Sequence, residues 1–217
     1  MPCPYAVTFA GCKWLPIHET IDSVDCSLQY NSDIHSRRSI RLPGYDYSQP
    51  GAYFVTICTA GRECVFGEVN IEKQSFRPSR LGELVIECWG LIPVHFPFVK
   101  LDAFVLMPNH SHGILQIIDS HEGETNNLEV TVRTEAFGKP VRGSIPTIIR
   151  SFKSAVSRRF ADERLGTIRP VWQRNYYERV IRSECDRDDV RKYILENLAK
   201  WSKDPENPAV MKSSSPP

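Results

Sequence analysis

The chain has 217 residues, with 27 Lys and Arg against 26 Asp and Glu and a formal net charge of +1. This length suffices for one domain with a sizeable core, and 41% hydrophobic and 10% aromatic residues exclude a disordered or low-complexity chain. No apolar run approaches the length of a membrane span, and no basic segment followed by an apolar stretch opens the chain, so we expect neither membrane contact nor a signal peptide.

The seven cysteines indicate a reducing compartment. They are scattered, odd in number and without a Cys-x-x-Cys pair, which argues against a zinc ribbon and against a disulfide framework. We therefore expect free thiols in a cytoplasmic protein.

The first half of the chain predicts strands and one helix. Residues 1–40 show no sustained period and are expected to form a variable or disordered extension. Residues 53–59 are β-branched and aromatic, which predicts a strand, and residues 60–62 predict a turn with residues 64–69 as the return limb of a hairpin. From Ser79 apolar residues recur at helical spacing as far as Ile92, and Pro93 is expected to close that helix.

The second half of the chain also predicts strands followed by helices. Residues 99–106 and 110–118 predict two strands joined by a tight connection, and residues 119–142 predict a flexible link. Residues 144–164 predict an amphipathic helix with a basic outer face, residues 171–182 are rich in aromatic and arginine side chains, and residues 186–201 predict a last helix. The tail from residue 203 is Pro- and Ser-rich. This order predicts an α+β domain, a central antiparallel sheet with flanking helices.

Two histidines stand out directly after the tight connection. His110 and His112 are two apart on a predicted strand, so they share a face about 6.5 to 7 Å apart along the backbone, from which two imidazoles can converge on one metal ion. The alternative is that one histidine packs in the core and the other is solvated. The strand pattern alone leaves both interpretations open.

The last helix offers a second polar pair. Tyr193 and Asn197 are four apart and share a helical face, so they can present a phenolic oxygen and an amide oxygen to one small volume. Apolar residues overlap this stripe, and Tyr193 as an ordinary half-buried aromatic is the alternative.

The charge is unevenly distributed along the chain. Residues 133–182 hold twelve Lys and Arg against four acids, a local balance of +8 that acids elsewhere mask. Cations interleaved with aromatic rings are what phosphate contacts and base stacking require, and a solvated basic helix is the alternative. The candidate nucleic-acid contacts are Arg150, Lys153, Arg158, Arg159, Trp172, Arg174, Tyr176, Tyr177 and Arg179.

Five blocks between residues 41 and 202 carry a family resemblance. They resemble the REP-associated tyrosine transposases, members of the single-tyrosine HUH transposases of the insertion-sequence-200-like type. The blocks read Leu-Pro-Gly-Tyr-Asp-Tyr at 42–47, Phe-Val-Thr-Ile-Cys-Thr at 54–59, Met-Pro-Asn-His-Ser-His-Gly at 107–113, Val-Trp-Gln-Arg-Asn-Tyr-Tyr-Glu at 171–178 and Arg-Lys-Tyr-Ile at 191–194.

This resemblance implies a fold, a reaction and roles for residues. The fold would be the ferredoxin-like or RRM-like fold of HUH endonucleases over residues 41–202, between the extension at 1–40 and a flexible tail at 203–217. The reaction would be metal-dependent cleavage and rejoining of single-stranded DNA beside a hairpin through a 5′-phosphotyrosine, in a bacterial protein associated with the nucleoid. By position, Tyr193 matches the nucleophile, and His110, His112 and Asn197 match the ligands of Mg²⁺ or Mn²⁺.

Two departures and two competing functions accompany this resemblance. Ser111 replaces a bulky hydrophobic residue, and Asn197 replaces a glutamine with a longer reach, which leaves the third ligand open. A domesticated, non-catalytic protein that binds DNA or RNA hairpins is one alternative, and a metal hydrolase using His-x-His is another. A monomer and a homodimer are both compatible with the sequence.

Overall fold

The computed structural model describes residues 42, 44–70, 72–118, 141–164, 170–204, 206–208 and 210. The extension predicted for residues 1–40, nearly all of the link predicted for residues 119–142 and the end of the tail lie outside these residues. Within the described part of the chain, no helix combines the length and the apolar character that crossing a membrane requires.

Four strands form the central sheet, namely β1 (Gly51–Cys58), β4 (Val99–Leu106), β5 (His110–Ile117) and β6 (Tyr177–Ile181). Their order is β4-β5-β1-β6, and each neighbouring pair is antiparallel. With helices α1 (Arg80–Gly90) and α3 (Ile145–Asp162), the chain runs β1-α1-β4-β5-α3-β6, which is the ferredoxin-like connectivity. The predicted α+β class, with a central antiparallel sheet and flanking helices, is confirmed.

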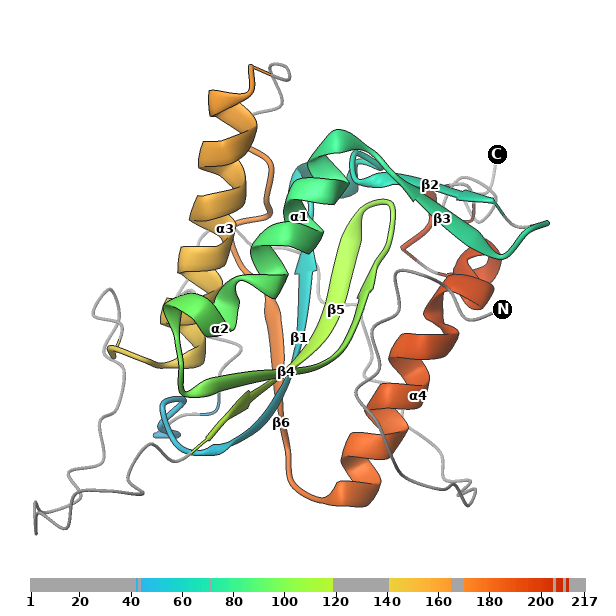
Figure 1. The fold of residues 1–217 in the computed structure, drawn as a ribbon. Helices are drawn as coiled ribbons and strands as arrows, with labels where there is room; N and C mark the ends of the chain where they lie inside the picture. The colour runs from blue at the N-terminus through green and yellow to red at the C-terminus, as the bar shows by residue number, and fades with distance from the viewer. Residues whose placement is uncertain are drawn as a thin grey trace, which may run out of the picture.

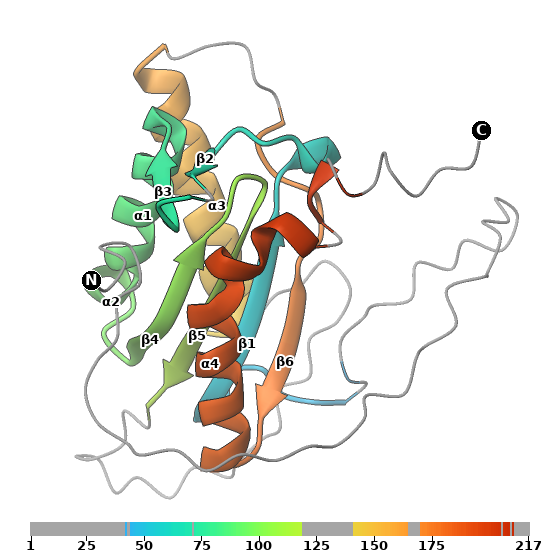
Figure 2. The ribbon, with the colours of Figure 1, turned by 90° about the vertical axis from the view of Figure 1, so that its right-hand side faces the viewer.

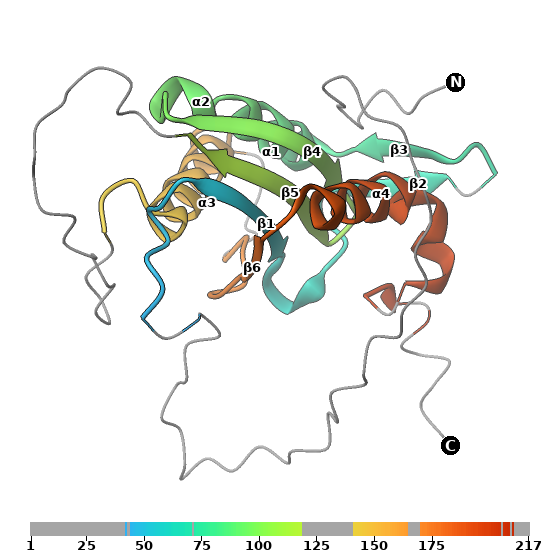
Figure 3. The ribbon, with the colours of Figure 1, turned by 90° about the horizontal axis from the view of Figure 1, so that it is seen from below.

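Helices cover the two faces of this sheet unequally (Figures 1 and 3). Helices α1 and α3 pack together on one face, and the short helix α2 (Ile92–His95) continues from α1. Helix α4 (Glu184–Lys200), followed by the turn η3 (Trp201–Lys203), crosses the opposite face (Figure 2). The sheet therefore separates α4 from the basic helix α3.

The core on the α1 and α3 side is dense and aromatic. Trp89 of α1 stacks on Phe104 of β4 with ring centroids 4.7 Å apart and meets Phe152 of α3 edge-on at 5.5 Å. Gly113 of β5 lies beneath the indole, where an added Cβ would come within 2.4 Å of the ring. This close approach explains why a central strand keeps a glycine.

The hairpin predicted from residues 53–69 is wrong. Residues 60–62 form the 3-10 turn η2 (Ala60–Arg62), but the chain then leaves the sheet, and β2 (Gly67–Asn70) pairs with β3 (Ser75–Pro78) in a separate two-stranded ribbon. Both edges of β1 are taken instead by β5 and β6. The local turn signal could not reveal these distant partners.

Two of the differences between predicted and observed helix boundaries have a clear local cause. Pro93 does not stop the chain from continuing as helix, because it lies in the first turn of α2, where its missing N–H costs nothing. Helix α4 begins at Glu184, two residues earlier than predicted, because the Ser183 side chain caps it by accepting from the Asp186 N–H at 3.1 Å.

Candidate active site

The site is built on the turn between β4 and β5, which is buried. The Met107 N–H donates to the His110 carbonyl at 2.8 Å and closes a two-residue loop of Pro108 and Asn109. The loop carbonyls accept from the backbone of Phe66 and Thr59 at 2.9 Å each. The turn is therefore enclosed by neighbouring chain and fixes the start of β5.

His110 and His112 follow this turn on one face of β5. Their ring centroids lie 4.6 Å apart, and both side chains are buried. The Nδ1 atom of His110 is 2.8 Å from Asn109 Oδ1, and that of His112 is 2.8 Å from Thr56 Oγ1 on β1. Each ring is thus held through Nδ1, which leaves both Nε2 atoms for other partners.

Helix α4 completes the site from the opposite side. Tyr193 Oη lies 3.3 Å from His112 Nε2, and the Trp201 ring lies 6.2 Å from the His110 ring. Asn197 falls between them at the same four-residue spacing and is buried, so it lies on the same face of α4 as Tyr193. Phe54 of β1 stacks on His112 at 5.5 Å and meets Tyr193 edge-on at 6.1 Å.

Burial keeps the histidines neutral. Loss of solvation lowers the pKa of His110 to about 4, with the positive charge of Arg62 acting in the same direction. Burial and the neighbouring His110 also lower the pKa of His112 well below its ordinary value. Burial raises the pKa of the Tyr193 phenol, and a hydrogen bond from Asn197 opposes this shift. The histidines are therefore in the form that binds metals.

Two buried atoms indicate that the site suits a cation. His110 Nε2 and Asn197 Oδ1 have no hydrogen-bond partner among the described residues. Leaving a buried acceptor unsatisfied costs about 1 to 3 kcal/mol, and a cation would satisfy both. No three side chains from His, Cys, Asp and Glu form a metal cluster in the described ranges. A metal ion at this site would therefore have two imidazole nitrogens and one amide oxygen as its available donors.

The predicted nucleic-acid contacts divide into two groups. On β6, Tyr177 and Arg179 lie on the same sheet face as Phe54, since β6 pairs directly with β1. Tyr177 is 51% exposed and its ring centroid is 6.4 Å from that of Phe54, beside the half-exposed Tyr193. Arg179 forms an ion pair with Asp186 at the start of α4. These residues belong to the face that carries the histidines.

The α3 group lies across the sheet from the histidines. Arg150 and Arg158 are exposed on the outer side of α3, whereas Arg159 pairs with Glu87 of α1 at 2.5 Å. The sequence placed these cations beside the candidate nucleophile in chain order, but the sheet separates the two in space. They cannot contact a phosphate held at the histidines.

Two of the other predicted nucleic-acid contacts, Trp172 and Lys153, have structural roles instead. Trp172 is only 7% exposed and donates its indole N–H to the Lys153 carbonyl at 3.1 Å, so it cannot stack on a base without opening the core. Lys153 donates through Nζ to the carbonyls of Gln173 and Arg174, and burial lowers its pKa to about 8. Tyr176 packs partly against the core, and Arg174 is exposed.

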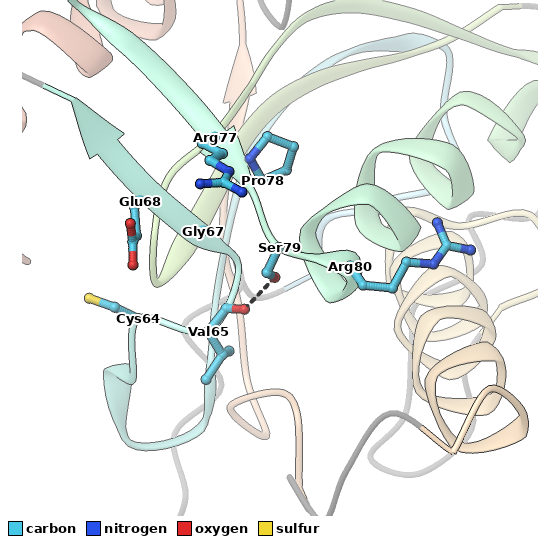
Figure 4. Close-up of a pocket in the computed structure, with 8 residues that line it drawn as sticks. All are labelled: Cys64, Val65, Gly67, Glu68, Arg77, Pro78, Ser79 and Arg80. Atoms are coloured by element: carbon cyan, nitrogen blue, oxygen red, sulfur yellow. Dashed lines mark hydrogen bonds between the residues drawn. The ribbon is translucent and has the colours of Figure 1, made fainter.

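A separate cleft of about 490 Å³ lies between the β2–β3 ribbon and the start of α1 (Figure 4). Its lining includes Cys64, Glu68 and Arg77, and Ser79, which also lines it, donates to the Val65 carbonyl at 2.7 Å. None of the residues that line it was predicted as a site residue.

Three residues that hold the histidines are not among the predicted site residues: Asn109, Thr56 and Phe54. Asn109 belongs to the tight connection between the two predicted strands, and its place directly before His110 is a usable signal. Thr56 and Phe54 were assigned only to a strand, because the pairing of β1 with β5 is needed to bring them opposite the histidines.

Comparisons with known proteins give one close relative and distant fold neighbours. No family model matches the chain. The solved structure of a REP-associated tyrosine transposase bound to a REP hairpin is 18% identical in sequence, with a TM-score of 0.45. The alignment covers 71% of this chain and 70% of the transposase chain. A Deinococcus radiodurans protein proposed to be a transposase is 20% identical with a TM-score of 0.37, covering 73% and 98%. TM-scores this low leave the function to be argued from the site.

The sequence relative is much closer. An uncharacterized protein of Haemophilus influenzae (strain ATCC 51907 / DSM 11121 / KW20 / Rd) is 42% identical over 177 residues, which are 81% of this chain and 96% of the relative. This chain belongs to the same protein family as that uncharacterized Haemophilus influenzae protein.

Proposed function

We propose that this protein is a metal-dependent transposase or endonuclease that cleaves and rejoins single-stranded DNA beside a hairpin through Tyr193. The observation that carries the proposal is the Tyr193 hydroxyl at 3.3 Å from His112 Nε2, next to the Nε2 of His110, which has no hydrogen-bond partner among the residues that the structure describes. In this arrangement the phenol of Tyr193 corresponds to the nucleophile, and the two neutral imidazoles correspond to ligands of a metal ion. The five sequence blocks described above point to the same reaction.

In this proposal His110, His112 and Asn197 hold Mg²⁺ or Mn²⁺. Bound there, the ion would supply positive charge to the phosphate oxygens as negative charge develops during attack. Two imidazole nitrogens suit Mn²⁺ better than Mg²⁺, which prefers oxygen ligands. We therefore expect tighter binding of Mn²⁺.

Tyr193 would perform the covalent step. Its Oη attacks phosphorus and loses its proton to solvent, the bond from phosphorus to the 3′ oxygen breaks, and that oxygen takes up a proton from solvent, which gives a 5′-phosphotyrosine and a free 3′-hydroxyl. A 3′-hydroxyl of another strand reverses the step, and no external energy source is needed. At 45% exposed, Tyr193 is reachable by a strand that lies on the part of this sheet face that α4 leaves uncovered, beside the exposed Tyr177.

The rest of that face suits the bases of such a strand. Tyr177 is exposed beside Phe54, and an exposed ring on a sheet is a stacking surface for any base. Arg174 on the preceding segment is exposed and able to contact phosphate. In this proposal Arg150 and Arg158 of α3 contact only DNA that extends around to the other side of the domain.

The decisive test is the covalent adduct. Single-stranded oligonucleotides, each with a short hairpin and a 3′ label, are incubated with protein and MnCl₂, and labelled protein is resolved on a denaturing gel and mapped by mass spectrometry. We expect the label on Tyr193 and its loss in Tyr193→Phe. Tyr177→Phe is the matched control, because it removes the neighbouring exposed hydroxyl and should keep the adduct.

Replacing both histidines separates catalysis from binding. His110→Ala combined with His112→Ala should abolish the adduct and leave hairpin binding intact, since neither ring lies on the exposed surface. An adduct in Tyr193→Phe would refute the assignment of the nucleophile. If the protein binds the hairpin oligonucleotide but forms no adduct under any metal condition, a non-catalytic hairpin-binding protein is favoured.

A further inference from the structure

We infer that the C-terminal segment after η3, made of residues 204, 206 and 207, sets the tautomer of His110 through the side chain of Asn109. This inference rests on the proposed function, because it concerns how the same site is kept ready for a metal ion. It assigns a positioning role to part of the segment that the sequence alone suggested to be a flexible tail.

The starting point is the amide of Asn109, which is 1% exposed. Its Nδ2 donates to the Glu206 carbonyl at 2.7 Å and to the Arg62 carbonyl at 3.2 Å. Backbone carbonyls can only accept hydrogen bonds, so the nitrogen end of the amide must face them. The oxygen end therefore faces His110, at 2.8 Å from its Nδ1.

The orientation of this amide decides where the His110 proton lies. Because Oδ1 can only accept, the Nδ1 of a neutral His110 must carry the hydrogen. The lone pair then lies on Nε2, the buried atom that has no partner among the described residues. A metal ion can bind only this unprotonated nitrogen.

The C-terminal segment is fixed to the end of the helix that carries the candidate nucleophile. Asn207 donates from Nδ2 to the Trp201 carbonyl at 2.9 Å, and the Glu206 N–H donates to Asp204 Oδ1 at 2.8 Å. Glu206 also forms an ion pair with Arg62. A continuous set of hydrogen bonds therefore runs from the end of α4 through Glu206 and Asn109 to His110.

Removing the Glu206 carbonyl should release the amide. With only the longer bond to Arg62 left, the Asn109 amide can turn over and present its NH₂ group to His110. His110 must then accept at Nδ1, and its proton moves to Nε2, where it blocks the metal. Loss of partners that orient metal ligands typically weakens metal binding about 10- to 100-fold.

The tautomer is measured directly in the metal-free protein. Long-range ¹H–¹⁵N spectra of the histidine-labelled full chain at pH 7.5, with His110→Gln to assign the signals, should show a protonated Nδ1 and an unprotonated Nε2. In a chain that ends at residue 203, the proton should move to Nε2, so the chemical shifts of Nδ1 and Nε2 should change places. Where both tautomers are populated, the two shifts should instead move toward each other. Electron paramagnetic resonance with MnCl₂ should show about 10- to 100-fold weaker binding.

Two variants separate this mechanism from general damage to the fold. Asn109→Asp keeps an acceptor toward His110 and cannot turn over to become a donor, so adding it to the shortened chain should restore the wild-type tautomer. Glu206→Ala removes the ion pair with Arg62 but keeps the carbonyl, so its spectrum and Mn²⁺ affinity should match those of the wild type.

Four outcomes are decisive. A protonated Nε2 in the wild type, or an unchanged tautomer and a Mn²⁺ affinity within about twofold after shortening, would overturn the inference. Failure of Asn109→Asp to restore the tautomer would also overturn it. A tautomer that switches as expected in a protein that never forms a DNA adduct would support the inference and refute the proposed function.

Discussion

Burial of His110 should make the metal-free protein less stable in mild acid. The folded protein binds a proton at His110 with a pKa of about 4, whereas the unfolded chain binds it near 6.5. Between these values protons bind the unfolded chain preferentially, so stability is greatest above about pH 6.5 and falls as the pH is lowered toward 4. Below the folded value the loss is complete.

The size of the effect follows from the two pKa values. The full difference corresponds to about 3 kcal/mol, because each tenfold change in proton affinity is worth about 1.4 kcal/mol. Between pH 7.5 and pH 5 about 2 kcal/mol of this should be lost from the free energy of unfolding. His112 shifts in the same direction and adds to the loss.

Urea unfolding of the full chain in EDTA at pH 7.5, 6 and 5 measures this loss. His110→Gln removes the titrating ring, so it should lose about 2 kcal/mol less than the wild type over this range, whatever its stability at pH 7.5. His95→Gln, on the exposed surface of α2, controls for removal of a histidine and should follow the wild type. An identical pH dependence in His110→Gln and the wild type would refute the reasoning.

Three further predictions concern the surroundings of the site. Tyr193→Phe removes a hydrogen bond to a histidine nitrogen that is a ligand in the proposed metal site, so the affinity for Mn²⁺, measured by paramagnetic resonance, should rise about 2- to 12-fold. A weaker affinity would show that the hydroxyl assists binding. Gly113→Ala places a Cβ within 2.4 Å of the Trp89 ring and should lower the free energy of unfolding in urea by about 1 to 3 kcal/mol. An unchanged urea midpoint of unfolding would mean that the indole can move aside without cost. Asp102→Asn breaks the partly buried ion pair between Asp102 and Arg191, which joins β4 to α4. It should lower the free energy of unfolding by about 1 to 3 kcal/mol in the same assay. If the difference from the wild type vanishes in 1 M salt, the pair acts only as a surface interaction.

Local patterns were sufficient for the elements around the histidines. The strand predicted for residues 99–106 matches β4, and β5 ends one residue before the predicted limit. The apolar spacing of residues 144–164 corresponds to α3 with its buried Ile148, Phe152 and Val156. Alternation along β5 also places both imidazoles on one face, because that depends only on the two-residue period of a strand.

Relations between distant segments could not be predicted in the same way. Thr56 and His112 meet only because β1 pairs with β5, and no local pattern specifies that register. The balance of +8 over residues 133–182 combines α3 with β6, although α3 packs on one face of the sheet and β6 presents Tyr177 and Arg179 on the other. A sum along the chain contains no information about which side of a sheet each charge occupies.

The enclosed turn between β4 and β5 has a practical consequence for protein engineering. Its backbone is bonded to Thr59 and Phe66, so an inserted residue or affinity tag there would break the core contacts that align β5. The tip of the β2–β3 ribbon is different, because residues 72–74 are exposed and connect two strands outside the main sheet. A fluorophore or a short epitope placed at that tip should leave folding undisturbed, which makes the tip a suitable attachment point for labelling this protein.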